Sequence, residues 1–507
     1  MNGRKAINID LNPMAVFMVK SLVAVVKQSD LAKAFEEVKL EYISKEPETQ
    51  EDIERILKKC PGPKKIPLPK GARGIDTADK LFSPIQTAKL ALLKAIIKKQ
   101  KNDDIRNSLL LMFSGMVTKV NLTYHTSSYV KSEHGGGPAV FRYYGYRIAP
   151  FPTNVNFVKS LELRYKYVSA AKKEMEYFVN NRTIHNLQNI KGTAVDLSFI
   201  SDESVDYIYT DPPYGKKILY LDLSVMWCAW LDLEVSEKDY EQEAIEGGSH
   251  RKSKNDYKNL IAQSIKEMYR VLKFDRWLSF VFAHKDPEFW HLIIDTAERC
   301  GFEYVGAVPQ KNGQPSFKKW KNPHTVLSGQ LIINFHKVKN PKTILKANLG
   351  MDISDIIMQT IEGIIAKNNG ATLEQINDEL IIKGLELGFL DLLKKRYSDL
   401  TPFLCESFDY DKETKIFSIR KNTKFQTHID LNLRIKYYLI SYLRRMEREK
   451  KTPGFDDIVL AIMPLLKNGI TPEKQTILSV LEDIGQRVGK ACWKIKQEGQ
   501  LLMNLTT

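Results

Sequence analysis

The sequence has little cysteine and no long apolar run. Its five cysteines, among 507 residues, lie far apart and never form a CxxC pair, which argues against a disulfide framework and a cysteine-rich zinc site. No apolar stretch approaches the ~18 residues that a membrane span needs, and the N-terminus lacks the basic and apolar regions of a secretory signal. We therefore expect a protein of the reducing cytoplasm.

Metal-ligand spacing is also missing, whereas positive charge is abundant. The nine histidines form no HExxH or comparable pattern, so no metal site is predicted. The 76 Lys and Arg residues exceed the 61 Asp and Glu residues, giving a net charge of +15. This excess favours a polyanionic partner, nucleic acid first. Single hydrophobic cores stop growing near ~250–300 residues, so the length predicts two or three domains.

Apolar runs alternate with helical stretches between residues 191 and 337. This alternation is typical of a doubly wound α/β domain, whose functional groups lie at the carboxyl ends of parallel strands. We expect strands at residues 5–10, 205–210, 277–283, 304–308 and 330–335, and helices at residues 13–26, 221–233, 257–272 and 288–300.

Two further regions flank or interrupt this pattern. Residues 27–184 exceed an ordinary connection and predict an insertion that contains helices and an aromatic, basic stretch. Residues 341–507 are mostly helical, with Thr372 and Gln375 placed as a capping box and Thr471-Pro472 placed as a helix start. Residues 408–420 alternate around a charged turn, as a hairpin would. The order helix, helix, hairpin fits a winged helix and fits a small α+β appendage as well.

The aromatic, basic stretch is a candidate nucleic-acid interface. Aromatic faces beside guanidinium groups suit stacked bases and phosphates, and a β-rich core with basic edges explains the pattern equally well. Arg142 and Arg147 are the candidate phosphate contacts. The aromatic members are Tyr124, Tyr129, Phe141, Tyr143, Tyr144, Tyr146 and Phe151, and Lys131 lies among them.

One motif carries recognisable chemistry: Asp211-Pro212-Pro213-Tyr214, directly after the strand predicted at residues 205–210. A carboxylate and a backbone carbonyl would be held as paired acceptors by two prolines of fixed φ, beside an aromatic face. Such a site suits a planar ring with an exocyclic amine that has been swung out of a nucleic-acid helix. Lys216 and Lys217 follow, where the phosphates of such a nucleotide would pass.

At these residues the sequence resembles the amino-methyltransferases that use S-adenosylmethionine to methylate adenine N6 or cytosine N4 in DNA. The resemblance covers residues 1–26 and 185–340 and implies a Rossmann-like class I methyltransferase sheet, with Asp211 to Tyr214 as the catalytic motif. It implies that Asp10 holds the cofactor ribose and that Asp196, with Leu197, meets the cofactor adenine. Aspartate at the head of the motif favours adenine, as in restriction–modification enzymes.

The sequence departs from this family at one place. The family's glycine-rich loop follows a first strand that should precede Asp10, and only nine residues stand there. That strand is central in the family's sheet, so without it two flanking strands would carry unpaired backbone groups. We expect a truncated or split enzyme, completed by an N-terminal fragment or a subunit. The alternative is that part of residues 27–185 fills the gap.

Three functions remain open from the sequence. The first is a DNA adenine-N6 methyltransferase. The second is a transfer-RNA guanine-N2 methyltransferase, because those enzymes also carry Thr-Asp-Pro-Pro-Tyr-Gly, although they do not need so long an insertion. The third is a non-catalytic DNA-binding remnant or specificity subunit. Cytosine-N4 as the target, the recognition sequence, a companion nuclease and the oligomeric state stay undetermined.

Overall fold

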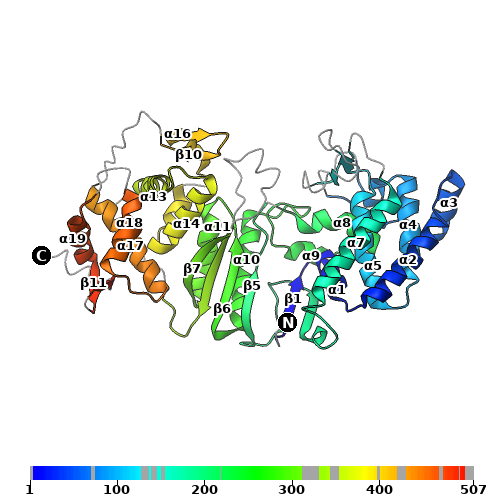
Figure 1. Ribbon diagram of the computed structural model, residues 1–507, viewed down its shortest axis with the longest axis horizontal. Helices are drawn as coiled ribbons and strands as arrows, with labels where there is room; N and C mark the ends of the chain where they lie inside the picture. Colours follow the sequence, from blue (N-terminus) through cyan, green and yellow to red (C-terminus); the bar gives the residue numbers. More distant parts are fainter. Residues whose placement is uncertain are drawn as a thin grey trace. The chain divides into compact units, whose positions relative to one another are not determined.

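The computed structural model divides into two compact units, and the chain passes between them three times (Figure 1). The first unit holds residues 1–196 and 215–260, and the second holds residues 197–214 and 261–507. Among the described helices, none is long and apolar enough to cross a membrane. The structure describes residues 4–69, 75–126, 136–138, 145–149, 155–216, 218–310, 330–342, 353–396, 400–419, 430–466, 472–489 and 491–496.

A helical core dominates the first unit. Leu93, Phe113 and Trp230 are fully buried at its centre. Local sequence fixes where helices begin: Ser83 and Gln86, for example, form a capping box that satisfies two backbone N–H groups at the start of α4. The helices are α1 (Pro13–Val23), α2 (Gln28–Ile43), α3 (Gln50–Lys59), η1 (Ala78–Leu81), α4 (Pro84–Lys98), α5 (Asp103–Lys119), α7 (Phe157–Met175), η2 (Ile184–Asn186), α8 (Tyr220–Leu231) and α9 (Glu237–Gln242).

The first unit also contains two small strand pairs. Strand β1 (Ala6–Asp10) runs parallel to β4 (Leu187–Lys191). Strand β2 (Tyr124–Thr126) runs antiparallel to β3 (Gly136–Pro138). Of the described strands in residues 27–184, β2 and β3 pair only with each other, so no described part of the insertion extends the pair formed by β1 and β4.

A four-stranded sheet lies in the second unit. Its order is β5-β6-β8-β7, with β5 parallel to β6 and with β8 antiparallel to both of its neighbours. Helix α10 (Lys254–Val271) leads into β6, and α11 (Pro287–Cys300) connects β6 to β7. The strands are β5 (Val205–Thr210), β6 (Leu272–Phe282), β7 (Phe302–Gln310) and β8 (Gln330–Lys337).

One face of this sheet packs against α10 and α11. Phe282 and Phe302 lie on the same face, because both stand opposite odd-numbered residues of β8. The ring of Tyr269 in α10 is 5.0 Å from that of Phe302, and the ring of Trp290 in α11 is 5.1 Å from that of Phe282. We call this side of the sheet the covered face.

The rest of the second unit repeats one order of elements. Each repeat has a helix, a short bridge, further helices and a hairpin, and each bridge joins the hairpin: Ala371 to Phe417 and Gly454 to Cys492. The first repeat contains α13 (Ile353–Asn368), α14 (Leu373–Leu387), α15 (Leu390–Arg396), α16 (Thr401–Ser407), β9 (Asp409–Asp411) and β10 (Ile416–Ser418). The second contains α17 (Leu431–Arg448), α18 (Phe455–Ile462), η3 (Met463–Leu466), α19 (Lys474–Ile484), β11 (Gly485–Val488) and β12 (Cys492–Ile495).

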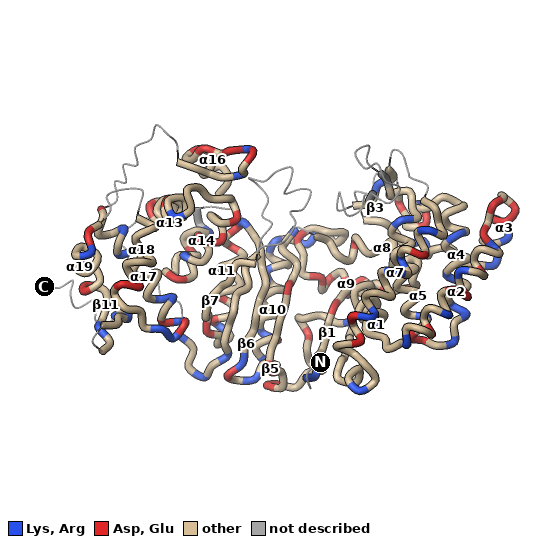
Figure 2. Tube along the Cα trace, in the orientation of Figure 1, with Lys and Arg blue, Asp and Glu red and all other residues tan. Residues whose placement is uncertain are grey.

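The expected hairpin near residues 408–420 is present as β9 and β10, and acidic residues gather on it beside α16 (Figure 2). The capping box of Thr372 and Gln375 is present at α14. The helix start expected at Thr471-Pro472 is wrong: Thr471 lies outside the described residues, and α19 begins at Lys474 with Glu473 as its N-cap.

The chain is a mixed α/β protein, and the strands expected in the α/β region are present. The single doubly wound sheet is not observed. Within the described residues, the strands of that region form two separate sheets, one in each unit. The physical reason is that β1 and β5 each have one edge with no described strand beside it.

Candidate functional site

The carboxyl end of β5 places Asp211 and Tyr214 in direct contact. The Tyr214 hydroxyl donates to Asp211 Oδ1 at 2.5 Å and lies 3.1 Å from Gln330 Oε1 at the start of β8. The edge of the Tyr214 ring meets Phe282, with ring centroids 5.3 Å apart. Asp211 is exposed. Pro212 and Pro213 restrict the two φ angles between the acid and the ring, so this loop is stiff before any ligand arrives.

Gly215 ends the motif in a left-handed conformation, with φ of 62°. A glycine fits this turn because side chains disfavour positive φ. Its carbonyl accepts from the amide of Glu246 at 3.3 Å, and Lys216 forms an ion pair with the Glu246 carboxylate at 2.8 Å. Lys216 remains mostly exposed, which leaves its ammonium within reach of solvent anions. Lys217, the other predicted phosphate contact, lies outside the described residues.

Asp10 ends β1 in the first unit and is partly buried. Its Oδ1 accepts from the Asn12 amide at 2.8 Å, and Asn12 in turn caps α1 by accepting from the Met14 amide at 3.0 Å. Burial raises the pKa of Asp10, and the Asn12 amide opposes this in part. A carboxylate with one anchored oxygen at a strand end can accept further hydrogen bonds from hydroxyl groups.

Asp196 and Leu197 follow β4 at the point where the chain passes from the first unit to the second. Asp196 is exposed. Leu197 is buried, and both of its backbone polar groups are engaged: its amide donates to Glu267 Oε2 at 2.9 Å, and its carbonyl accepts from Arg270 at 2.8 Å. Any contact of Leu197 with a ligand therefore has no free backbone donor to use.

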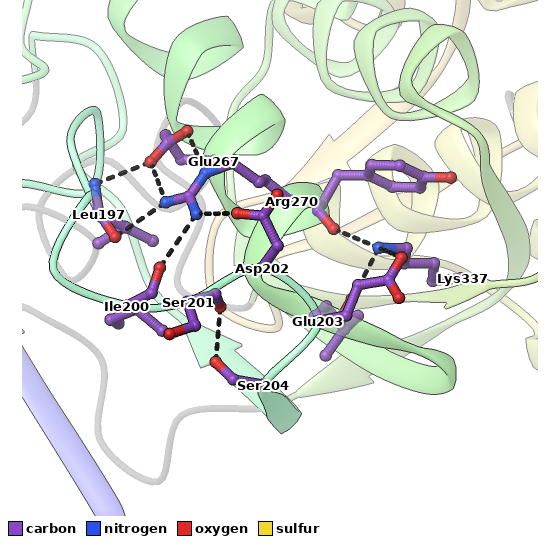
Figure 3. A network of polar contacts seen from close by, with 11 residues as sticks. Leu197, Ile200, Ser201, Asp202, Glu203, Ser204, Glu267, Arg270 and Lys337 are labelled. Carbon is purple, nitrogen blue, oxygen red and sulfur yellow. Dashed lines mark hydrogen bonds and ion pairs between the residues drawn. The ribbon is translucent and has the colours of Figure 1, made fainter.

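Arg270 is the centre of the polar network that holds this segment (Figure 3). Besides Leu197, its guanidinium donates to the Ile200 carbonyl at 3.0 Å and pairs with Asp202 at 2.5 Å and Glu267 at 2.8 Å. These groups tie the loop before β5 to helix α10. The loop therefore enters β5 from a fixed position, which also fixes the strand that presents Asp211.

Four residues of this region were not predicted as site residues. Gln330 and Phe282 contact Tyr214 from β8 and β6, and no spacing in the sequence connects them to the motif. Glu267 and Arg270 did carry a signal, because an acid and a base three residues apart share one helix face. That signal predicts a local pair and does not reveal the contact with Leu197.

The predicted nucleic-acid residues are only partly described. Arg147 is half-buried, and Arg142 lies outside the described residues. Two members of the aromatic set belong to the protein interior: Tyr124 and Tyr146 are almost fully buried, and Tyr146 donates to the Leu223 carbonyl at 2.7 Å. These two rings cannot stack on bases, so the interpretation of the whole stretch as a stacking surface is wrong for them.

The part of the chain that the structure describes contains no cluster of three or more His, Cys, Asp or Glu side chains that could hold a metal ion.

Known proteins show little likeness to this chain. No family model matches it, and no curated protein matches it. Among solved structures it is similar to a Thermus thermophilus protein that is provisionally described as a DNA modification methylase, with 13% sequence identity and a TM-score of 0.18. The match covers 32% of this chain and 60% of that protein, so this chain spans about 60% of its length. A likeness at this level carries no argument about fold or function.

Proposed function

We propose that this chain is a DNA amino-methyltransferase that acts on adenine N6 with S-adenosylmethionine as the methyl donor. The observation that carries the proposal is the arrangement at the end of β5. An exposed carboxylate, a proline carbonyl and an aromatic ring follow one another on a stiff loop at the carboxyl end of a parallel strand. This is the edge of an α/β sheet where ligands bind.

The loop supplies what methylation of an exocyclic amine requires. Asp211 and the Pro212 carbonyl accept the two N–H groups of the amine and thereby hold the nitrogen lone pair out of conjugation with the ring. Tyr214 stacks on the base once the base has left its helix. S-adenosylmethionine supplies the methyl group as an electrophile. The amine attacks directly, so no covalent bond between protein and base is needed.

The cofactor residues fit this role unequally. Asp10 fits, because a carboxylate anchored by the Asn12 amide keeps acceptor capacity for the two hydroxyls of a ribose. Asp196 fits, because its exposed carboxylate can accept from an adenine amine. Leu197 fits only as a positioning residue, since Glu267 and Arg270 already occupy its backbone groups. These roles belong to the proposal together with the family resemblance.

The choice of DNA over RNA rests on the net charge and on the long helical insertion, which a transfer-RNA enzyme with the same motif does not need. Lys216, Lys217, Arg142 and Arg147 are the proposed phosphate contacts. A companion nuclease would be consistent with a restriction–modification role.

The test is transfer of a labelled methyl group from S-adenosylmethionine to plasmid DNA and, separately, to transfer RNA. We expect label in DNA at N6 of adenine and a loss of about a thousand-fold or more in Asp211→Ala, because the amine loses its charged acceptor. Asp206→Ala is the matched control: Asp206 is another exposed acid of β5, but it pairs with Lys273 at 2.8 Å at the opposite end of the strand.

Label found only in transfer RNA would replace DNA by RNA as the substrate. DNA binding that is unaffected by Asp211→Ala, without transfer to either nucleic acid, would instead support the non-catalytic interpretation. Equal loss of transfer in Asp206→Ala and Asp211→Ala would mean that damage to β5, and not the chemistry of Asp211, causes the loss.

A further inference from the structure

The side of the β5–β8 sheet opposite the covered face exposes large side chains. Tyr207 stands opposite Trp277, and Tyr209 stands opposite Ser279, so the two tyrosines share a face with the indole. Tyr207 is 54% exposed, Tyr209 57% and Trp277 39%. At about 200 Å² for each ring side chain, these three leave roughly 300 Å² accessible, the scale of an interaction site. We call this side the open face.

The edge of β5 on this sheet is open as well. β5 is the terminal strand in the order β5-β6-β8-β7, and no described strand pairs with its outer edge. Natural edge strands are usually protected by charges, proline or a bulge that faces outward. In β5 the five residues from Asp206 to Thr210 include only one charge, Asp206, at the start of the strand. Tyr207, Ile208 and Tyr209 instead give it the composition of a strand with neighbours on both sides.

We propose that the outer edge of β5 and the open face together bind a β-strand followed by an amphipathic helix, from a polypeptide segment other than the described ones. The strand would run parallel to β5 with apolar side chains on both faces. The helix would lay its apolar stripe over Tyr207, Tyr209 and Trp277.

Handedness places the helix on the open face. The connection from β5 to β6 includes α10, which packs on the covered face. Crossovers between parallel strands are right-handed in almost all cases. A strand on the other side of β5, followed by a helix that leads away from β5, must therefore place that helix on the opposite face. That is the face on which the three rings are exposed.

A second copy of this chain fits less well. Two β5 edges related by a two-fold axis would pair in antiparallel fashion, because the axis reverses the strand direction. Such a pair would cover the edge but would bring no helix onto the open face. The strand–helix segment satisfies both observations.

The segment also deepens the proposed function, and only this part of the inference rests on that function. A glycine-rich turn between the added strand and its helix would bring backbone N–H groups to the carboxyl edge of the sheet, beside the loop that carries Asp211. The bound segment would then supply the part of the methyltransferase pattern that the sequence lacks.

Hydrogen exchange measured on the full chain tests the docking surface without cofactor or nucleic acid. We expect a monomer by light scattering in which the amides of residues 205–210 exchange at least ten-fold faster than those of residues 277–282 in β6. The probe is a synthetic polypeptide of about 35 residues: a Val/Ile strand, a glycine turn and a helix with a leucine stripe. It should slow exchange in β5, and the same peptide with two prolines in its strand should not.

Matched variants identify the surface. Tyr207→Lys with Tyr209→Lys should abolish the protection, because two ammonium groups would be buried under the helix. Leu460→Lys is the control, since Leu460 is 74% exposed on α18 of the same unit. Protection that survives the double change would overturn the proposal, as would β5 amides already protected in the monomer. Protection accompanied by the mass of a dimer would assign the edge to a second copy instead.

The outcome for docking is separable from the outcome for methylation. Protected β5 amides without methyl transfer, with or without the peptide, would leave the docking surface intact and remove the proposed function. Methyl transfer by a chain whose β5 amides the peptide does not protect would do the reverse.

Discussion

Acidic side chains have different environments in the two units. Near α8 and α9 of the first unit, Asp222 and Glu243 are almost completely buried, and burial raises the pKa of both. Around β5 of the second unit, Asp206 and Asp211 are exposed. Lys273, followed by Arg276, lowers the pKa of Asp206. Exposed acids can keep their charge at neutral pH, whereas the buried acids lose stability when they ionise.

This difference separates folding from chemistry. A carboxylate that must accept hydrogen bonds from an amine has to be ionised and accessible, and the acid at the end of β5 is accessible. The buried acids instead hold backbone in place: Glu243 accepts from the Leu221 amide at 2.9 Å, and Asp222 accepts from the Ser249 amide at 3.1 Å. The following predictions test the contrast, from the largest expected effect to the smallest.

Glu243→Gln should stabilise the first unit at neutral and higher pH. Burial raises the pKa of Glu243 from 4.5 to about 7. The folded protein therefore retains a proton that the unfolded chain releases above pH ~4.5, so stability falls as the pH rises from 4.5 to about 7. At ~1.4 kcal/mol per pKa unit the full loss is about 3 kcal/mol. The amide oxygen of glutamine can still accept from Leu221.

Thermal unfolding at pH 5 and pH 8 measures this effect. The stabilisation by Glu243→Gln should be small at pH 5 and largest at pH 8. Glu241→Gln, the same change two residues away on an exposed side chain, should leave the unfolding temperature unchanged at both pH values. An equal gain at both pH values would show that Glu243 does not ionise within this range.

Arg270→Met should destabilise the second unit by about 2 kcal/mol, because Glu267 and the carbonyls of Leu197 and Ile200 would lose their donor. The loss contrasts with Arg276→Met, a change of the same type. Arg276 contacts the exposed Asp206 at 3.3 Å, and an exposed pair of this kind contributes at most about 1 kcal/mol. Urea unfolding of both variants gives the comparison, and similar midpoints would mean that the Arg270 network does not anchor the loop.

The sequence predicts the chemistry of the motif better than its surroundings. Asp211 to Tyr214 and the strand before them follow from local pattern, because proline geometry and strand composition act over a few residues. Gln330, more than a hundred residues later, reaches Tyr214 only through the pairing of β8 with β6. The burial of Tyr124 and Tyr146 likewise depends on tertiary packing, and an aromatic residue beside a basic one has the same local pattern in a core and on a surface.

The two separate sheets teach a related lesson. The sequence predicts where strands lie, since each strand has its own apolar run. Which strands become neighbours depends on segments that are distant in the chain. The parallel direction of β5 and β6 was expected from the alternation of strands and helices, and it is observed. A common neighbour for β1 and β5 is not among the described strands.

Ser249→Ala should cost about 1–2 kcal/mol. The Ser249 hydroxyl donates to Asp222 Oδ1 at 2.6 Å in a buried site, and a buried charged acceptor is costly to leave without its donor. Because the pKa of Asp222 is already raised by burial, losing this donor raises it further. The destabilisation should therefore be greater at pH 8 than at pH 5. Thermal unfolding at the two pH values measures it, and a loss independent of pH would contradict the role of the ionised acid.

Tyr214→Phe removes the same kind of hydrogen bond from an exposed acid and should have the smallest effect on stability. The Tyr214 hydroxyl donates to Asp211 at 2.5 Å, but Asp211 is exposed, so water can replace the lost donor and the cost should stay below about 0.5 kcal/mol. The phenyl ring keeps its contact with Phe282 and its capacity to stack on a base. Methyl transfer should fall by only a few-fold, whereas Tyr214→Ala should lose about ten- to a hundred-fold, because stacking on a base is worth ~1–3 kcal/mol. If Phe and Ala lost transfer equally, the hydroxyl and not the ring would be the group that the reaction needs. If Tyr214→Phe destabilised the protein as much as Ser249→Ala, exposure would not distinguish the acids of the two units.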